Sequence, residues 1–222
     1  MYAFDENTPP KEIITAACCE IAGQLQPEGY KFLKSQMSIV KRVGELVFTV
    51  HFQSNRYNQR GESAEVWVSC SVENKKYNES YYGHNLGTIS HMNFTGWEFY
   101  GEENYNRSVK DILQRLQTFF IPLTHRFVND MDRLVLDVVD KGFYPDNETT
   151  GYAISAEFLL RYGNIGLVQK AIQKYYDLCH PQAKANFRKS VLVLKEERQP
   201  DALYAFWSLA EAVARHNINI VY

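Results

Sequence analysis

The stretch from Gln36 to Val72 constrains the fold more than any other, because its apolar residues recur at every second position. Such a period places one row of side chains on a buried face and the next on a more polar face. The alternation predicts three strands, at Met37–Arg42, Leu46–Ser54 and Ala64–Val72. The first two are separated only by Val43, Gly44 and Glu45, a connection typical of a hairpin. The sequence therefore predicts an antiparallel meander whose apolar side needs a cover.

Helical patterns before and after the meander can supply that cover. Apolar residues at helical spacing between Ile13 and Leu25 predict a first helix with Thr8 as its N-cap. Further strands are expected at Leu86–Met92 and Trp97–Tyr100. Ser108 and Asp111 have the spacing of a capping box, and the chain from there on has helical periodicity. The fold we expect is α+β: an N-terminal helix packed on an antiparallel sheet of about five strands, followed by an all-helical C-terminal region.

One segment, Pro145–Gly151, has the composition of a turn and marks the best candidate boundary. It divides the chain into an α+β sheet domain, residues 1–144, and a helical region, residues 151–222. The helical region is expected either to pack on the sheet domain or to form a small second domain.

Composition narrows the class of partner. The 222 residues carry a formal net charge of −2, which argues against nucleic-acid binding driven by a positive field. The 4 cysteines contain no C-x-x-C pair and are expected to be reduced thiols of a cytoplasmic protein. The first residues lack the features of a signal peptide, and no apolar run is long enough to span a bilayer, so we expect no membrane association.

Known catalytic motifs are missing from the sequence, which has no H-E-x-x-H, no phosphate-binding glycine motif and no G-x-S-x-G elbow. We therefore expect no catalytic residue, no metal site and no cofactor. Two weaker arrangements stay open. Cys70 could pair with His51 on a neighbouring strand, although Cys70 falls on the apolar face. Glu65 with Lys41 nearby could begin a nuclease-type metal site, although the second carboxylate is missing.

The polar face of the predicted sheet holds an aromatic residue, Trp67, among hydrogen-bonding side chains. An exposed tryptophan in such surroundings can anchor a partner protein. The helical region could instead cover this face, and Trp67 would then be part of a core. The candidate partner-binding residues are Arg56, Tyr57, Trp67, Tyr81, Tyr82 and Trp97.

After an amphipathic helix, the chain contains the segments PEGYKFLKSQMSIVKRVGELVFTVHFQSNRYN, AEVWVSCSVEN, LGTIS, GWEFYGEE and FFIPLTHRF. Together these segments resemble a family of small bacterial domains of unknown function, and similar domains occur among immunity proteins of polymorphic-toxin loci. The resemblance covers about residues 11–127 and includes no catalytic motif. The helical region after Gly151 lies outside it.

These observations lead to one expected function and two alternatives. The first is a non-enzymatic cytoplasmic protein-binding protein, of the kind of a bacterial immunity protein that neutralises a toxin by direct contact. The second is a metal-dependent nuclease or other hydrolase, which would bring His51, Glu65 and another acid together. The third is a homo-oligomeric scaffold, which would expose apolar stripes on Ile165–Cys179 or Leu203–Val213. The sequence leaves the oligomeric state open.

Overall fold

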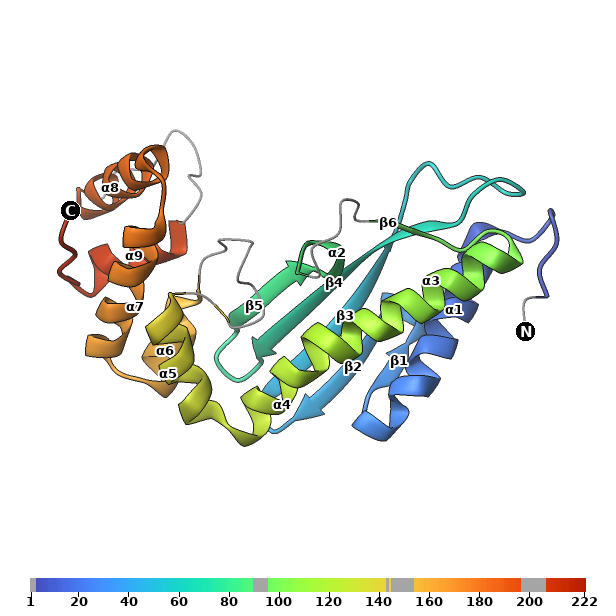
Figure 1. Cartoon of the computed structure of the whole chain (residues 1–222), viewed down its shortest axis with the longest axis horizontal. Coiled ribbons are helices and arrows are strands. Elements are labelled where there is room, and N and C mark those ends of the chain that lie inside the picture. Colours follow the sequence, from blue (N-terminus) through green and yellow to red (C-terminus); the bar gives the residue numbers. More distant parts are fainter. Residues whose placement is uncertain (1–2, 90–95, 143, 145–153, 197–206) are drawn as a thin grey trace. The chain divides into compact units, whose positions relative to one another are not determined.

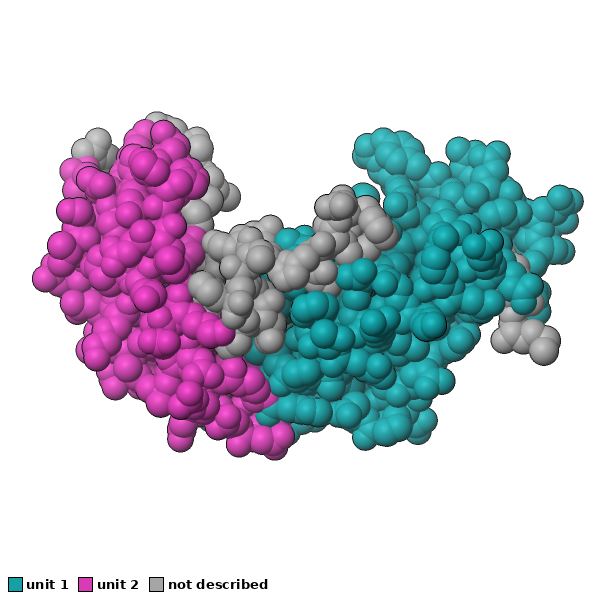
Figure 2. All heavy atoms as spheres, viewed as in Figure 1, with its two compact units in different colours: residues 1–125 teal, residues 126–222 magenta. Residues whose placement is uncertain are grey.

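A computed structural model describes residues 3–89, 96–142, 144, 154–196 and 207–222. The chain divides into two compact units, residues 1–125 and residues 126–222, which Figure 2 colours separately. This division falls inside helix α4 (Ile121–Asn129). The boundary expected from the sequence, the turn Pro145–Gly151, lies outside the described residues.

The first unit contains the predicted meander, and the α+β fold class is confirmed. Its strands are β1 (Lys31–Leu33), β2 (Ser38–Val43), β3 (Leu46–Ser54), β4 (Glu65–Asn74), β5 (Glu79–Asn85) and β6 (Gly96–Glu98). They pair in the order β1-β2-β3-β4-β5, and every pair is antiparallel. Strand β6 pairs with the first residues of β4, beyond the end of β5. Two 3₁₀ turns, Gln26–Glu28 and Lys34–Gln36, flank β1.

One face of the sheet forms the core of this unit. Its central side chains, which include Phe48, Val50, Val68 and Cys70, are fully buried. Helices α1 (Pro10–Leu25) and α3 (Glu102–Arg115) lie side by side against the sheet (Figure 1). The apolar stripe predicted for the first helix is buried, as its spacing requires. The residue at the N-cap position of α1 is Pro9 and not Thr8, whose hydroxyl donates to the Asp5 carboxylate.

Two predictions for the middle of the chain are wrong. Residues 86–89 form a short helix, α2 (Leu86–Ile89), where a strand was expected, and residues 90–92 lie outside the described part of the chain. Ser108 does not cap α3, because this helix already begins at Glu102. The Ser108 hydroxyl instead donates to the carbonyl of Glu98, 2.6 Å away, and so ties α3 to β6.

The helical chain runs through Pro122 without a break. A π-helical turn, Leu116–Phe120, joins α3 directly to α4. Proline lacks the N–H that would continue the regular α-helical bonds, and a widened turn immediately before it is one way for a helix to run on. The break falls later, at Asp130, ahead of α5 (Met131–Lys141).

The described part of the second unit is helical, as expected. After α5 come α6 (Ala156–Tyr162), α7 (Ile165–Leu178), α8 (Pro181–Lys195) and α9 (Trp207–Arg215). Phe127 of α4, Tyr144 and Phe158 of α6 form a buried ring cluster, with centroids 5.3–6.1 Å apart. This cluster gives a physical reason why the end of α4 belongs with the helices that follow it. No helix in the described ranges is long and apolar enough to cross a membrane.

Candidate functional site

The second face of the sheet carries the polar side chains that the alternation predicts. The register places His51 opposite Ser69 and Gln53 opposite Trp67, and all four residues are exposed. The Trp67 side chain keeps 38% of its surface accessible. Trp67 is therefore a surface residue and not part of a core.

The loop between β3 and β4 is fixed by a set of hydrogen bonds. The Asn58 side chain accepts from the backbone N–H of Glu65 at 2.7 Å and donates to the carbonyl of the same residue at 2.8 Å. The backbone N–H of Asn55 donates to that carbonyl as well, at 2.9 Å. Farther along, the Gln59 N–H donates to the Ser63 hydroxyl at 3.0 Å. The loop is thus an ordered projection at the end of the β3–β4 hairpin.

This ordered loop presents an arginine–tyrosine pair. Tyr57 is 66% exposed, and its backbone N–H donates to the Asn55 side chain at 3.0 Å. The Arg56 guanidinium lies 4.6 Å from the centre of the Tyr57 ring and also donates to the Tyr57 hydroxyl. Asn55 pairs with Glu65, two residues before Trp67, so the pair and the tryptophan belong to one end of the hairpin. We call Arg56, Tyr57 and Trp67 the hairpin patch.

The other three predicted partner-binding residues, Tyr81, Tyr82 and Trp97, are buried and offer no surface to a partner. They are 2%, 2% and 3% exposed. Pairing explains two of them, because Tyr82 lies opposite Val72 and Trp97 opposite Val66, which places both rings on the face that the helices cover.

Each buried ring has a packing partner within the first unit. The Tyr82 ring stacks on Phe120 at 6.2 Å, and the Trp97 indole donates to the Asp111 carboxylate at 2.8 Å. Tyr81 lies where the β4–β5 register shifts, and its hydroxyl donates to the Glu79 carboxylate at 2.7 Å. Nothing in the local sequence signals these cross-strand neighbours, which is why burial was missed.

Two acids near the hairpin patch, Glu65 and Glu98, are engaged with protein groups. The Asn55 amide donates to the Glu65 carboxylate, which occupies the space above Gly96 that any larger residue would fill. The Glu98 carboxylate accepts from the backbone N–H groups of Ala64 and Tyr100, both at 2.7 Å. These carboxylates therefore order the loop and do not converge on an open cleft.

The register separates the residues of the two weaker catalytic arrangements. Cys70 lies on the buried face, whereas His51 lies on the exposed one, and burial raises the pKa of the Cys70 thiol. Lys41 lies opposite Phe48 on the buried face, with its ammonium 5.6 Å from the centre of the Tyr30 ring, whereas Glu65 lies on the exposed face. Among the described residues, no group of three His, Cys, Asp or Glu side chains could hold a metal ion.

A serine–histidine contact on the exposed face has a structural explanation. The Ser38 oxygen is 2.9 Å from Nδ1 of His51, and the Ser38 hydroxyl donates to the carbonyl of Gln36 at 2.9 Å. The Ser38 oxygen is thus within hydrogen-bond distance of both a backbone carbonyl and the imidazole, and the contact holds the His51 ring against β2.

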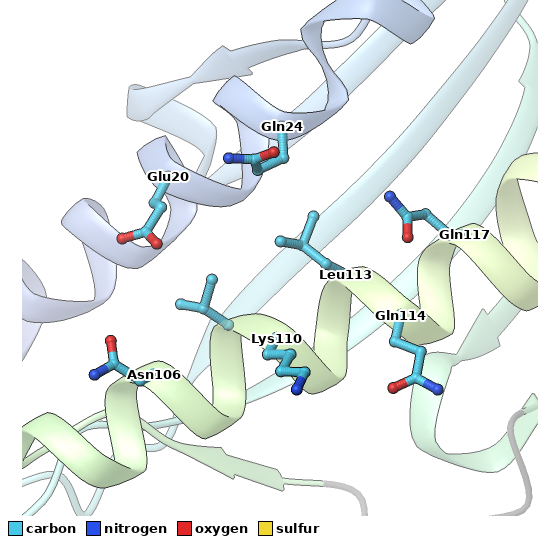
Figure 3. Close-up of a pocket in the computed structure, with 8 residues that line it drawn as sticks. Glu20, Gln24, Asn106, Lys110, Leu113, Gln114 and Gln117 are labelled. Atoms are coloured by element: carbon cyan, nitrogen blue, oxygen red, sulfur yellow. The ribbon is translucent and has the colours of Figure 1, made fainter. Parts of the chain in front are cut away.

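The helical face of the first unit has a groove between α1 and α3. Its volume is about 440 Å³, and Figure 3 shows Glu20 and Gln24 of α1 across from residues of α3. Half of its eight lining residues carry amide side chains, and Val109 and Leu113 are its apolar members. Glu20 already accepts a hydrogen bond from the Tyr105 hydroxyl at 3.1 Å. The groove brings together no acid–base pair suited to catalysis.

A more enclosed pocket of about 530 Å³ lies between β6 and α3. Its charged groups are bonded to protein partners: Arg115 donates to Asp111 at 2.8 Å, and Arg107 donates to the Asn104 side chain at 2.6 Å. Burial favours the neutral form of Asp111, but the hydrogen bonds from Arg115 and Trp97 outweigh it and lower the pKa of the carboxyl. The charged side chains that line this pocket are thus already bonded to other groups of the protein.

In the described part of α7 and α9, the exposed apolar residues do not form a continuous stripe of the kind a scaffold would use. On α7 the exposed apolar residues are Ile165 and Leu178, at opposite ends of the helix. On α9, Leu209 and Val213 are buried, and residues 203–206 of the expected stripe lie outside the described ranges.

No family model, no curated protein and no solved structure matches this chain. The hairpin patch is therefore the feature from which a function is inferred.

Proposed function

We propose that this protein is a non-enzymatic cytoplasmic binding protein that recognises another protein through the hairpin patch. The observation that carries the proposal is an exposed tryptophan, Trp67, beside an ordered loop that presents Arg56 and Tyr57. Tryptophan, tyrosine and arginine are the residues that most often dominate the binding energy of protein interfaces.

The ordered loop strengthens this proposal. Binding costs free energy when flexible side chains and loops must be immobilised, and a loop held in advance reduces that cost. Asn55 and Asn58 hold the backbone, and the Arg56 side chain already rests on the Tyr57 ring. The polar side chains of His51, Gln53 and Ser69 around Trp67 suit the rim of an interface.

The biological role we propose is that of an immunity protein that neutralises a toxin by covering it. This role is supported by the sequence resemblance over residues 11–127 and by the free thiol state of Cys18, Cys19, Cys70 and Cys179, which suits a reducing compartment. Neutralisation by contact needs no catalytic group in the immunity protein, only a surface that buries the toxin's working face.

The test is affinity purification of the tagged full chain from its native host, with mass spectrometry and a solution mass of the complex. We expect one stoichiometric protein partner, with binding weakened about 30-fold or more by Trp67→Ala combined with Tyr57→Ala, as for a hot spot. The matched control is Tyr77→Ala. Tyr77 is 39% exposed, and Lys76 lies 5.0 Å from its ring centre, but it sits beyond the other end of β4.

Two results would overturn the proposal. One is a partner that binds the double variant as tightly as it binds the unaltered chain. The other is a protein that purifies without a partner but with a bound divalent metal, which would favour the hydrolase alternative.

A further inference from the structure

A second cluster of cations and aromatic rings lies on the helical unit. The Arg188 Nε donates to the Tyr176 hydroxyl at 2.8 Å, and its guanidinium carbon is 5.8 Å from the Tyr176 ring centre and 5.7 Å from that of Tyr222. The Lys184 ammonium lies 5.3 Å from the Tyr176 ring centre. We call Tyr176, Lys184, Arg188 and Tyr222 the cation cluster.

The cluster is held in place from both sides. The Gln173 side chain forms two hydrogen bonds with the backbone of Val221, at 2.8 and 3.1 Å, and so anchors the segment that carries Tyr222. The Tyr176 ring is buried and packs on Phe187 at 5.7 Å and edge-on to Tyr222 at 5.6 Å. Arg188 thus rests on a fixed aromatic support.

The same cluster is accessible. Tyr222 is 55% exposed, and Leu192, one turn after Arg188, is 62% exposed. Lys195 is exposed farther along α8 and falls on the same edge as Lys184 and Arg188 by helical spacing. An edge of α8 therefore combines positive charge with apolar and aromatic surface.

Helices α7 and α8 are strongly basic in a chain that is slightly acidic. Together they carry six lysines and arginines against one acid, Asp177, a net charge of +5, whereas the whole chain has −2. Asp177 accepts from Gln173 at 3.0 Å, and the next acid, Glu196, lies beyond the end of α8. The charge of these two helices is thus a local feature that the overall composition hides.

We propose that the cation cluster binds an acidic segment of a protein, with carboxylates on Lys184 and Arg188 and an apolar side chain against Tyr222 and Leu192. Arginine fixed on aromatic rings suits carboxylates, because its planar fork can form two parallel hydrogen bonds. A nucleic acid is the less favoured partner: three cations on one helix edge do not make the long positive track that phosphates follow, and the chain as a whole repels them.

Fluorescence anisotropy of the full chain tests this proposal with three labelled probes. One is a peptide that alternates glutamate and leucine, the second replaces every glutamate by glutamine, and the third is oligouridylate. We expect binding of the acidic peptide alone, and weaker binding as salt is added. Loss of this binding on Trp67→Ala would place it at the hairpin patch and overturn the assignment.

Matched charge reversals locate the surface. Lys184→Glu with Arg188→Glu should weaken acidic-peptide binding at least about tenfold. Lys170→Glu with Lys189→Glu makes the same charge change at one lysine of α7 and one of α8, both outside the cation cluster, and should change it about threefold or less. Arg188→Gln, which leaves no new charge near Tyr176, should also weaken binding and guards against misfolding of the reversed variant.

Three further outcomes would overturn the proposal. If both charge-reversed variants lost the same affinity for the acidic peptide, the peptide would be attracted only by the net charge of the chain. Equal binding of the glutamine peptide would remove the role of carboxylates. Tighter binding of oligouridylate than of the acidic peptide would assign the surface to nucleic acid. None of these outcomes bears on the hairpin patch, so the two proposals fail separately.

Discussion

Two tryptophans of the sheet unit have opposite environments, and substitution should separate them. Trp97 is 3% exposed and donates to Asp111, so Trp97→Ala should lower the free energy of unfolding by about 3–5 kcal/mol. Trp67 is 38% exposed on the polar face, so Trp67→Ala should cost less than about 1 kcal/mol. Urea denaturation of both variants measures the difference. Similar losses in the two would contradict the assignment of Trp67 to the surface.

His84 makes the stability of the sheet unit depend on pH. Burial lowers its pKa to about 4 from the ordinary value of 6.5, and its ring packs edge-on against Tyr82 at 4.6 Å. Between these values the unfolded chain binds the proton more readily than the folded chain. The stabilising contribution of neutral His84 to the free energy of unfolding is therefore complete above pH 6.5. As the pH falls towards 4, this contribution decreases by at most about 3 kcal/mol.

The measurement for His84 is the free energy of unfolding from pH 7 to pH 5. His84→Gln should flatten the curve over this range, relative to the unaltered chain. His216→Gln, which removes an exposed histidine, should leave the slope unchanged. An equal effect of the two variants would show that His84 is not the group responsible.

At the scale of elements, Gly142 shows how the end of one helix depends on the next. It ends α5 with a φ of 78°, and a Cβ there would lie 3.0 Å from the backbone nitrogen of Tyr175 on α7. Gly142→Ala adds both left-handed strain, about 1–2 kcal/mol, and a contact with backbone that cannot move aside.

A second glycine separates the two effects. Gly44, in the β2–β3 turn, has a φ of 56° but nothing within 4 Å of a Cβ, so Gly44→Ala adds strain alone. We expect Gly142→Ala to lower the melting temperature of its unit more than Gly44→Ala lowers that of the other, measured by calorimetry. An equal or smaller loss would mean that α7 yields to the added methyl group.

Which elements the sequence predicts depends on where their stabilising contacts lie. Strand β3, Leu46–Ser54, is found at its predicted bounds because the alternation lies within its own residues. Strand β5 was missed because its sequence, ESYYGHN, does not alternate and its register with β4 shifts between Val72 and Glu73. Cross-strand pairing, and not local preference, forms β5.

The candidate site follows the same rule. Arg56 and Tyr57 stand in a polar stretch between two predicted strands, and Trp67 stands on the polar face of an alternating strand, so the sequence alone could propose all three. The hydrogen bonds that Asn58 forms across the loop could not be predicted, because the sequence shows only an asparagine, which is a common residue in turns. The cation cluster was not predicted, because Tyr222 is 34 residues from Arg188 and meets it only in the folded unit.

At the scale of the whole molecule, the two units have separate cores and should unfold in separate steps. Phe48 is buried in the sheet unit, and Phe158 is buried in the ring cluster of the helical unit. Calorimetry of the full chain should show two transitions. Phe48→Ala should lower the temperature of one transition and Phe158→Ala that of the other. Each substitution should lower the free energy of unfolding of its unit by about 3–5 kcal/mol. A single transition shifted by both variants would show one cooperative core.

The meander has a consequence for synthesis. Strands β1 to β5 each pair with the next strand along the chain, so the sheet needs few distant segments to meet. When residue 125 has been added, 97 residues of the second unit are still to come. At ordinary translation rates they take roughly 5–20 seconds, whereas a β-hairpin forms within about 10 microseconds. We expect the nascent chain to present a folded sheet unit while the ribosome is still making the helices.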